Sequence, residues 1–227
     1  AKGRPAMDAV AALLDDPNPY IQSRAIYLLY QMGISGPRMA GYPADQPTTQ
    51  RKIAAYRAMR RAGLDFSASA LRLAADGDPA VRREVALSMR NETIETSKEI
   101  LVAIASGYDG QDRSYLEAFG TGATGKEEEI FRAVKGIIGS EDFRNWTEAF
   151  SGIAWRLHPA SSIDDFLARA KLESLPMNQR RMAMDAIAFI PTRAASQAMQ
   201  TLAQLDTPLK ADATWWAMNR ANNHWRD

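Results

Sequence analysis

The stretch Asp76-Gly-Asp-Pro-Ala-Val-Arg-Arg-Glu-Val-Ala-Leu-Ser-Met-Arg90 decides the fold class of this chain. Its first residues favour a turn, Pro79 stands where the first turn of a helix tolerates proline, and an apolar stripe with helical spacing follows. The same order recurs after Asp16-Pro-Asn-Pro19 and after Asp206-Thr-Pro208. We therefore expect a succession of helices that begin at similar turns.

The repetition extends along nearly the whole chain. Similar apolar segments recur at intervals of about 30 to 37 residues, and the clearest internal match pairs residues 113–120 (RSYLEAFG) with residues 144–151 (RNWTEAFS). The aligned anchors are Gln22, Lys52, Arg82, Arg113, Arg144, Arg181 and Asp212. A period of this length indicates stacked helical hairpins that bury their apolar faces against one another. No segment shows the alternation of a strand, so we expect an all-α protein.

Each repeat is expected to hold an A helix, a short turn and a B helix. The expected A helices are residues 8–14, 66–75, 94–106, 127–138, 163–172 and 194–205, and B helices include 20–32, 81–90 and 210–222. Between residues 33 and 48, three prolines and two glycines replace the A helix of the second unit. This loop is either a binding element or a degenerate repeat that covers a seam.

Composition disfavours several classes of function. The 227 residues include 28 Lys and Arg against 27 Asp and Glu, and a dedicated nucleic-acid binder usually has a larger basic excess. The absence of cysteine excludes thiolate catalysis, Cys-ligated zinc and covalent haem attachment within these residues. The two histidines have no partner at metal-ligand spacing. We expect no catalytic residue, no cofactor and no metal.

The two ends of the sequence suggest a longer polypeptide. The first residues carry neither an initiator Met nor a signal-peptide core, and the last helix is aromatic-rich rather than a polar cap. No apolar run is long enough to cross a bilayer, so we expect no membrane insertion. We expect residues 1–227 to be a single repeat domain that is processed or excised from a longer chain.

The segment Gly120-Thr-Gly-Ala-Thr-Gly125 matches the GxGxxG pattern of dinucleotide-binding proteins. That pattern needs a preceding strand, whereas here it follows an expected helix and precedes three glutamates that would repel a pyrophosphate. We expect a flexible turn between helices, with Gly120 or Gly122 as the residue that follows the helix end.

Arginines gather on the expected B helices, which line the concave face of such a solenoid. They are Arg24, Arg51, Arg57, Arg60, Arg61, Arg82, Arg83, Arg113, Arg144, Arg180 and Arg181. They could form a groove for an anionic partner. Bridging to carboxylates or carbonyls of the adjacent repeat is the favoured interpretation. Arg57, Arg60 and Arg61 form the best candidate for an exposed protein-binding patch.

The last expected helix is rich in tryptophan. Trp215 and Trp216 are adjacent and cannot both face one core, and Trp225 and Asn219 lie close to them in sequence. Aromatic side chains are typical of interface hot spots. We predict that Trp215, Trp216, Asn219 and Trp225 form a docking surface for a protein or a following domain. The alternative is that the tryptophans seal the open end of the array.

Residues 78–87 (DPAVRREVAL) resemble a HEAT repeat. The resemblance implies a HEAT-like α-solenoid, a right-handed superhelix of about seven helical-hairpin units. Residues 108–127 and 213–225 are similar to the helical-repeat region of large bacterial secreted proteins described as membrane-bound dehydrogenase or haem-binding CxxCH proteins. In that family the repeats lie between a propeller-like quinoprotein dehydrogenase domain and a c-type cytochrome domain, and no haem-binding or catalytic residue carries over to this chain.

These resemblances imply a non-catalytic scaffold or protein-interaction domain that spaces or docks redox domains. The periplasm or the exterior of the cell is then the expected location, although the absence of cysteine also fits the cytoplasm. The alternative is a nucleic-acid enzyme similar to the HEAT-like DNA glycosylases, with Trp146, Trp155 and Asp185 in a concave groove. A third possibility, a modifying or lyase partner of a tetrapyrrole-carrying protein, rests on the resemblance in fold alone.

Overall fold

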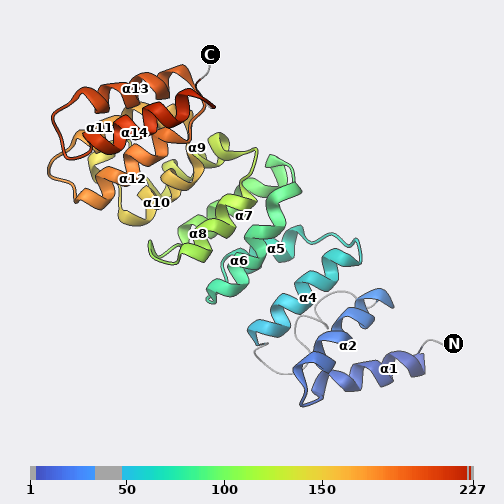
Figure 1. Ribbon diagram of the computed structural model, residues 1–227. Helices are drawn as coiled ribbons and strands as arrows, with labels where there is room; N and C mark the ends of the chain where they lie inside the picture. The colour runs from blue at the N-terminus through green and yellow to red at the C-terminus, as the bar shows by residue number, and fades with distance from the viewer. Residues whose placement is uncertain (1–3, 34–47, 224, 226–227) are drawn as a thin grey trace. The chain divides into compact units, whose positions relative to one another are not determined.

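The helices begin at capping side chains and prolines in the computed structural model, which describes residues 4–33, 48–223 and 225 (Figure 1). At the start of helix α2 (Pro19–Gln31), Asn18 Oδ1 accepts a hydrogen bond from the Tyr20 backbone N–H at 2.9 Å. Thr147 Oγ1 accepts one from the Phe150 N–H at 3.1 Å at the start of α10 (Glu148–Leu157). Among the residues so described there is no β-strand, which confirms the all-α class.

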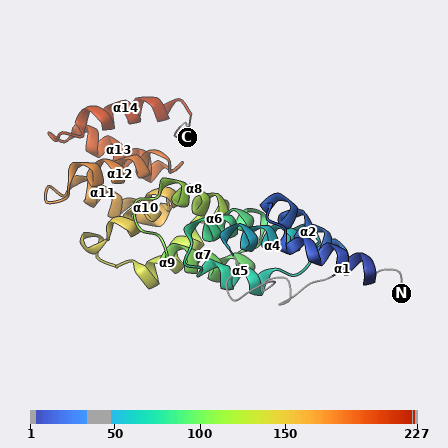
Figure 2. The same ribbon diagram turned by 90° about the horizontal axis from the view of Figure 1, so that it is seen from below.

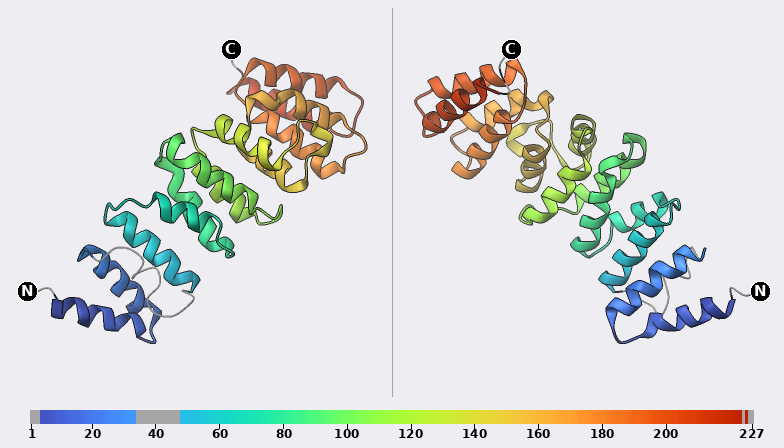
Figure 3. Two further views of the ribbon diagram at one scale, coloured as in Figure 1. Left: turned by 180° about the vertical axis from the view of Figure 1, so that it is seen from behind. Right: turned by 45° about the vertical axis from the view of Figure 1, so that its right-hand side comes forward.

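The chain divides into two compact units, residues 1–85 and 86–227. The first unit holds α1 (Arg4–Ala12), a 3₁₀ turn η1 (Leu13–Asp15), α2, α4 (Thr49–Arg61), α5 (Ser67–Ala74) and most of α6 (Pro79–Ser88). Helix α2 contacts both α1 and α4 (Figure 3), and Ile26, Leu29 and Ala58 are buried in the resulting core. The expected loop at 33–48 lies outside the described residues except at its two ends.

The second unit is built from four helix pairs. They are α7 (Ile94–Ser106) with α8 (Arg113–Gly122), α9 (Glu127–Ile138) with α10, α11 (Ile163–Lys171) with α12 (Met177–Ala188), and α13 (Arg193–Gln204) with α14 (Lys210–Ala221). Three 3₁₀ turns also lie in this unit: η2 (Met89–Asn91) before α7, η3 (Phe143–Asn145) between α9 and α10, and η4 (Ala160–Ser162) between α10 and α11. The second helices of successive pairs, α8, α10, α12 and α14, contact one another in that order. Figure 2 shows α11 to α14 following one another in this part of the chain.

Polar contacts of arginine side chains join neighbouring helices and turns. Arg51 donates to Gln22 Oε1 at 3.1 Å and to the Leu14 carbonyl at 2.6 Å. In the second unit, Arg180 Nε donates to the Ala170 carbonyl at 2.9 Å, and Arg181 pairs with Asp212 at 3.1 Å. For Arg51 and Arg181 the bridging interpretation is confirmed, because their guanidinium groups contact the neighbouring repeat, whereas Arg180 joins the two helices of one pair.

The internal match of residues 113–120 with 144–151 does not extend to the helix boundaries. Helix α8 begins at Arg113, because Asp112 Oδ1 accepts a hydrogen bond from the Tyr115 N–H at 3.0 Å. Arg144 instead lies in η3, and α10 begins only at Glu148, after the Thr147 cap. The two stretches therefore share sequence, but the second is partly a turn, so the predicted alignment of these two repeats was wrong in register.

The expected turn at the GxGxxG stretch was also placed wrongly. Gly120 and Gly122 are buried inside α8, and the helix ends before Gly125, whose φ of +76° a side chain would disfavour. The following Lys126 Nζ donates to the carbonyls of Met89 and Glu92, at 3.1 Å each. These residues pack and cap helices, and nothing in their arrangement forms a phosphate cradle.

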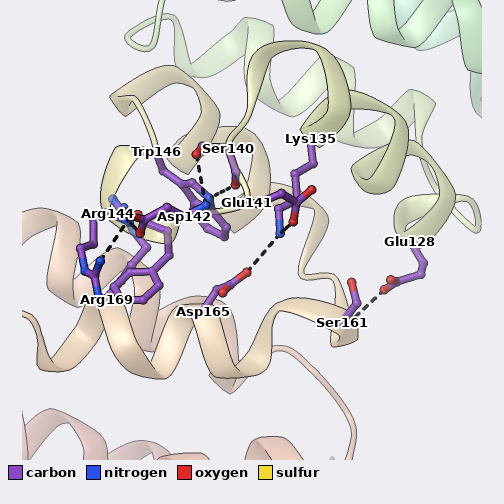
Figure 4. Close-up of polar contacts among 11 residues, drawn as sticks. Glu128, Lys135, Ser140, Glu141, Asp142, Arg144, Trp146, Ser161, Asp165 and Arg169 are labelled. Carbon is purple, nitrogen blue, oxygen red and sulfur yellow. Dashed lines mark hydrogen bonds and ion pairs between the residues drawn. The ribbon is translucent and has the colours of Figure 1, made fainter.

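An aromatic cluster fills the core near η3, and Figure 4 shows the polar contact of one member, Trp146, with Ser140. Trp146 is 5% exposed, packs edge-on against Phe150 and Phe166, and donates its indole N–H to the Ser140 carbonyl at 2.9 Å. The buried Arg169 guanidinium lies over the Trp146 ring, 5.3 Å from its centroid. Trp146 is therefore a core residue, and its suggested role in an open groove is corrected.

Candidate functional site

The face formed by α8, α10, α12 and α14 contains two adjoining hollows. The first has a volume of about 380 Å³, the second about 270 Å³, and both are lined by Arg181 and Asp185. We call this surface the mixed groove. The lining residues that define it are Tyr108, Arg113, Glu148, Trp155, Arg181, Asp185, Asp212, Trp215 and Trp216. It exists because the second helix of each pair contacts the second helix of the next.

Aromatic rings form the first part of the mixed groove. Tyr108 follows α7 and stacks on the buried Tyr115, with ring centroids 5.7 Å apart. Trp155 projects from α10 and is half-buried. The Arg113 guanidinium lies over the Trp155 ring, 4.6 Å from its centroid. This end therefore offers flat apolar surfaces beside charged groups, a combination that suits polypeptide recognition.

Two tryptophans on α14 form the other end. Trp216 is half-buried and donates its indole N–H to Asp185 Oδ1 at 2.9 Å, whereas 57% of Trp215 is exposed. Their rings meet edge-on, with centroids 4.8 Å apart. The expectation that these adjacent tryptophans face different environments is confirmed. Trp215 is therefore an exposed aromatic side chain whose ring packs against Trp216, which Asp185 holds in place.

Charges in the mixed groove are mostly paired. Glu117 joins Arg113 and Arg156 at 2.6 and 2.8 Å, and Arg181 pairs with Asp212 at 3.1 Å. Burial raises the pKa of Asp185, while the Trp216 hydrogen bond and the nearby Arg181 act in the opposite direction. The surface has no excess of free cations with which to hold a polyanion.

The remaining predicted residues are distributed over both units. In the first unit, Arg57 pairs with Glu84 through Nε at 2.8 Å, and Arg61 is exposed on the same helix, α4. Arg60 instead packs its guanidinium over Phe66 at 5.5 Å, and its Nε is buried. Arg57, Arg60 and Arg61 therefore do not form one exposed patch, because Arg60 turns toward aromatic rings.

Two predicted residues near the end of the chain differ in their surroundings. Asn219 is exposed on α14. Trp225 is half-buried and donates its indole N–H to the Ile190 carbonyl at 2.9 Å. Trp225 thus ties the end of the chain to the turn before α13, as the sealing interpretation requires, whereas Trp215 keeps the exposure that docking requires.

Sequence reasoning missed three residues of the mixed groove, Tyr108, Glu148 and Asp212. Tyr108 lies in a turn and Glu148 is the first residue of α10. Trp155 and Asp185 were considered only for the nucleic-acid alternative, and the structure does bring both to the same hollow. A search for residues on one face of successive B helices would have found Trp155. Finding Glu148 in the same way requires knowing that α10 begins at this residue.

Neither a metal centre nor a membrane span is evident in the part of the chain that the structure describes. Within residues 4–33, 48–223 and 225, no group of three or more histidine and carboxylate side chains could hold a metal ion. No helix in this same part of the chain is both long and apolar enough to cross a membrane. Comparison of the chain with models of protein families, with curated proteins and with solved structures finds no match.

His158 lies behind the mixed groove and should make the second unit sensitive to acid. Burial among Trp155 and Phe189 is the main cause that lowers its pKa to about 4; the charges of Arg156 and Arg220 contribute to this shift, and Glu117 opposes it. Because the folded pKa lies below the unfolded value, the unfolded chain binds the proton first, and stability falls as pH falls from about 6.5 toward 4. We expect a loss of roughly 2 kcal/mol between pH 7 and 5.

The test of this pH dependence compares the parent with His158→Gln in urea, read by tryptophan fluorescence. All five tryptophans lie in residues 86–227, so the signal reports the second unit. The variant should lose most of the extra destabilisation at pH 5. An imidazole NMR titration with its midpoint near pH 6.5 would contradict the assigned cause.

Proposed function

We propose that this chain is a HEAT-like α-solenoid that binds a protein partner along the mixed groove and acts as a non-catalytic scaffold. The observation that carries the proposal is the exposed Trp215, held by Trp216 and Asp185 beside a hollow that continues to Trp155. Aromatic anchors beside paired charges are the composition of protein-binding surfaces. The repeat-spaced contacts between successive helices support the solenoid form.

The partner is inferred to be a polypeptide rather than a nucleic acid. A nucleic-acid surface gains its affinity from unpaired Lys and Arg that contact phosphates. Here Arg113 and Arg181 are already paired with Glu117 and Asp212, and the exposed Glu148 adds a negative charge. The burial of Trp146 removes one of the three residues on which the glycosylase alternative depended.

The sequence resemblance to redox proteins narrows the choice of partner. We propose that the scaffold docks a domain of a secreted redox assembly, such as a c-type cytochrome domain. Stacked helix pairs suit this role because their side chains are fixed by packing and so set the position of whatever binds to them. In this proposal the single repeat domain spans residues 1–227.

Site-specific photo-cross-linking tests the proposal. A photoreactive phenylalanine analogue replaces Trp215 in the purified chain, and a matched probe replaces Ile137, which is 65% exposed on α9 away from the residues of the groove. With an extract of the source cells, we expect a protein adduct that stains for haem from position 215 and only background from position 137. Trp155→Ala should reduce the adduct.

Three outcomes would count against parts of this proposal. Equal adducts at positions 215 and 137 would show that the groove is not a binding surface. A specific protein adduct without haem would reject the redox partner and keep the scaffold. A nuclease-sensitive adduct, with affinity that falls steeply with salt, would support the nucleic-acid alternative instead.

A further inference from the structure

The first unit contains a pocket that the mixed groove does not involve. It has a volume of about 290 Å³ and is formed by residues of α2, α4 and α5 and the turn that follows. Most of its lining is apolar, with Ala55, Tyr56, Met59 and Leu73 around it. Tyr30, Lys52, Ser69, Arg72 and Asp76 supply the polar groups. A concave, largely apolar lining with a few polar groups is typical of small-molecule sites.

Tyr30, which lines this pocket, has an unsatisfied hydroxyl. Only 3% of Tyr30 is exposed, yet its Oη has no hydrogen-bond partner among the residues that the structure describes. Burial raises the pKa of Tyr30, and the positive charge of Arg72 opposes that rise. An unpaired buried hydroxyl is unfavourable, so a ligand that accepts its hydrogen bond removes that penalty.

The charges around the pocket leave one cation available. Lys52 Nζ is paired with Asp76 Oδ2 at 2.7 Å. Arg72 is exposed and makes no ion pair or hydrogen bond within the described ranges. Arg72 and Tyr30 both line the pocket, and the positive charge of Arg72 acts to lower the pKa of the Tyr30 hydroxyl. The pocket therefore combines one hydroxyl donor, one unpaired guanidinium and an apolar wall.

We propose that this pocket binds a small monocarboxylate with an apolar chain. The carboxylate accepts a hydrogen bond from the Tyr30 Oη–H and pairs with Arg72, while the chain packs against Met59 and Leu73. A neutral apolar molecule would leave the Tyr30 hydroxyl unpaired. A phosphate dianion would exceed the one available cation and would not use the apolar wall. The proposal does not depend on a function for the mixed groove.

Binding of octanoate to the full chain tests this inference. We expect saturable octanoate binding by calorimetry, with NMR shifts at the methyl groups of Met59 and Leu73, and no saturable binding of octylammonium. Arg72→Gln should raise the Kd about tenfold, and Tyr30→Phe several-fold, since hydrogen bonds to charged groups are among the strong ones. Arg24→Gln, an exposed change on α2, is the matched control and should leave the Kd unchanged.

The variants also separate binding from folding. Tyr30→Phe keeps the buried ring, and Arg72 lies at the surface, so both variants should retain the parent's circular dichroism. Failure of octanoate to shift Met59 and Leu73 would overturn the proposal. So would octylammonium binding as tightly as octanoate, or a Kd that neither variant changes.

Discussion

Gly122→Ala is expected to lower the free energy of unfolding of the 86–227 unit by about 2–3 kcal/mol. A Cβ at this position of α8 would collide with the backbone carbonyl oxygen of Ala86, which belongs to the same unit. The Ala86 carbonyl carbon and Leu101 Cδ2 would each be 3.1 Å away. Because the closest atom belongs to the backbone, a change of side-chain rotamer cannot relieve the clash. Urea unfolding followed by tryptophan fluorescence measures the effect.

Gly136→Ala is the matched control for this substitution. Gly136 lies within α9 of the same unit, and a Cβ there would meet nothing within 4 Å. Alanine is the better helix former, so Gly136→Ala should raise stability by about 0.5–1 kcal/mol. The opposite signs of the two changes distinguish close packing at Gly122 from a general effect of glycine replacement. A stabilising Gly122→Ala would show that α8 does not approach Ala86 so closely.

The helices could be predicted from sequence because their starts and stops depend on neighbouring residues. The expected A helices at 94–106 and 127–138 coincide with α7 (Ile94–Ser106) and α9 (Glu127–Ile138). In the first of these Thr93 provides the cap, accepting from the Thr96 N–H at 3.5 Å. Local signals of this kind need no knowledge of the rest of the fold.

Interhelical contacts are the part that sequence did not reveal. The three glycines of residues 120–125 were predicted to form a turn, because glycine is common in turns. Gly122 is instead required by the close approach of α8 to Ala86, which the local sequence does not indicate. Trp146 looked as available as Trp155, yet only the former is buried by Phe150 and Phe166. Which side chain faces a groove depends on which helices pack against each other. A repeat length of about 30 residues does not specify these neighbours.

The same limitation applied to the arginines. Sequence could place Arg113 and Arg181 on B helices and offer two roles for them, an anion-binding groove or structural bridges. The structure shows that each is paired with a carboxylate, so their charge is already used within the chain. Among the described arginines, Arg169 is the most buried, yet sequence analysis did not single it out, because it belongs to an A helix, α11.

Arg169→Met should lower the free energy of unfolding of the second unit by about 3 kcal/mol. Arg169 is 1% exposed, donates through Nη1 to the Phe143 carbonyl, and donates through Nη2 to Ser151 Oγ and Gln179 Oε1 at 2.9 and 3.0 Å. Methionine fills much of the same volume but leaves these three acceptors without their donor. Removal of a buried charge acts in the opposite sense, since burial lowers the pKa of Arg169. The lost hydrogen bonds and the lost stacking on Trp146 should outweigh it.

Arg132→Met on α9 is the control, because the Arg132 side chain is 72% exposed and pairs only loosely with Glu128 at 3.7 Å. An exposed pair of this kind should change stability by less than about 0.5 kcal/mol. Arg169→Lys adds a second comparison, since it keeps the charge but cannot reach all three acceptors, and its stability should fall between those of the parent and Arg169→Met.

The measurement is urea unfolding with tryptophan fluorescence, in which Trp146 reports directly on its contact with Arg169. If Arg169→Met proved as stable as the parent, the free-energy cost of burying the guanidinium would equal the stabilisation from its hydrogen bonds. Arg169 would then contribute no net stability, and a role in fixing the register of η3 against α11 and α12 would have to explain its burial.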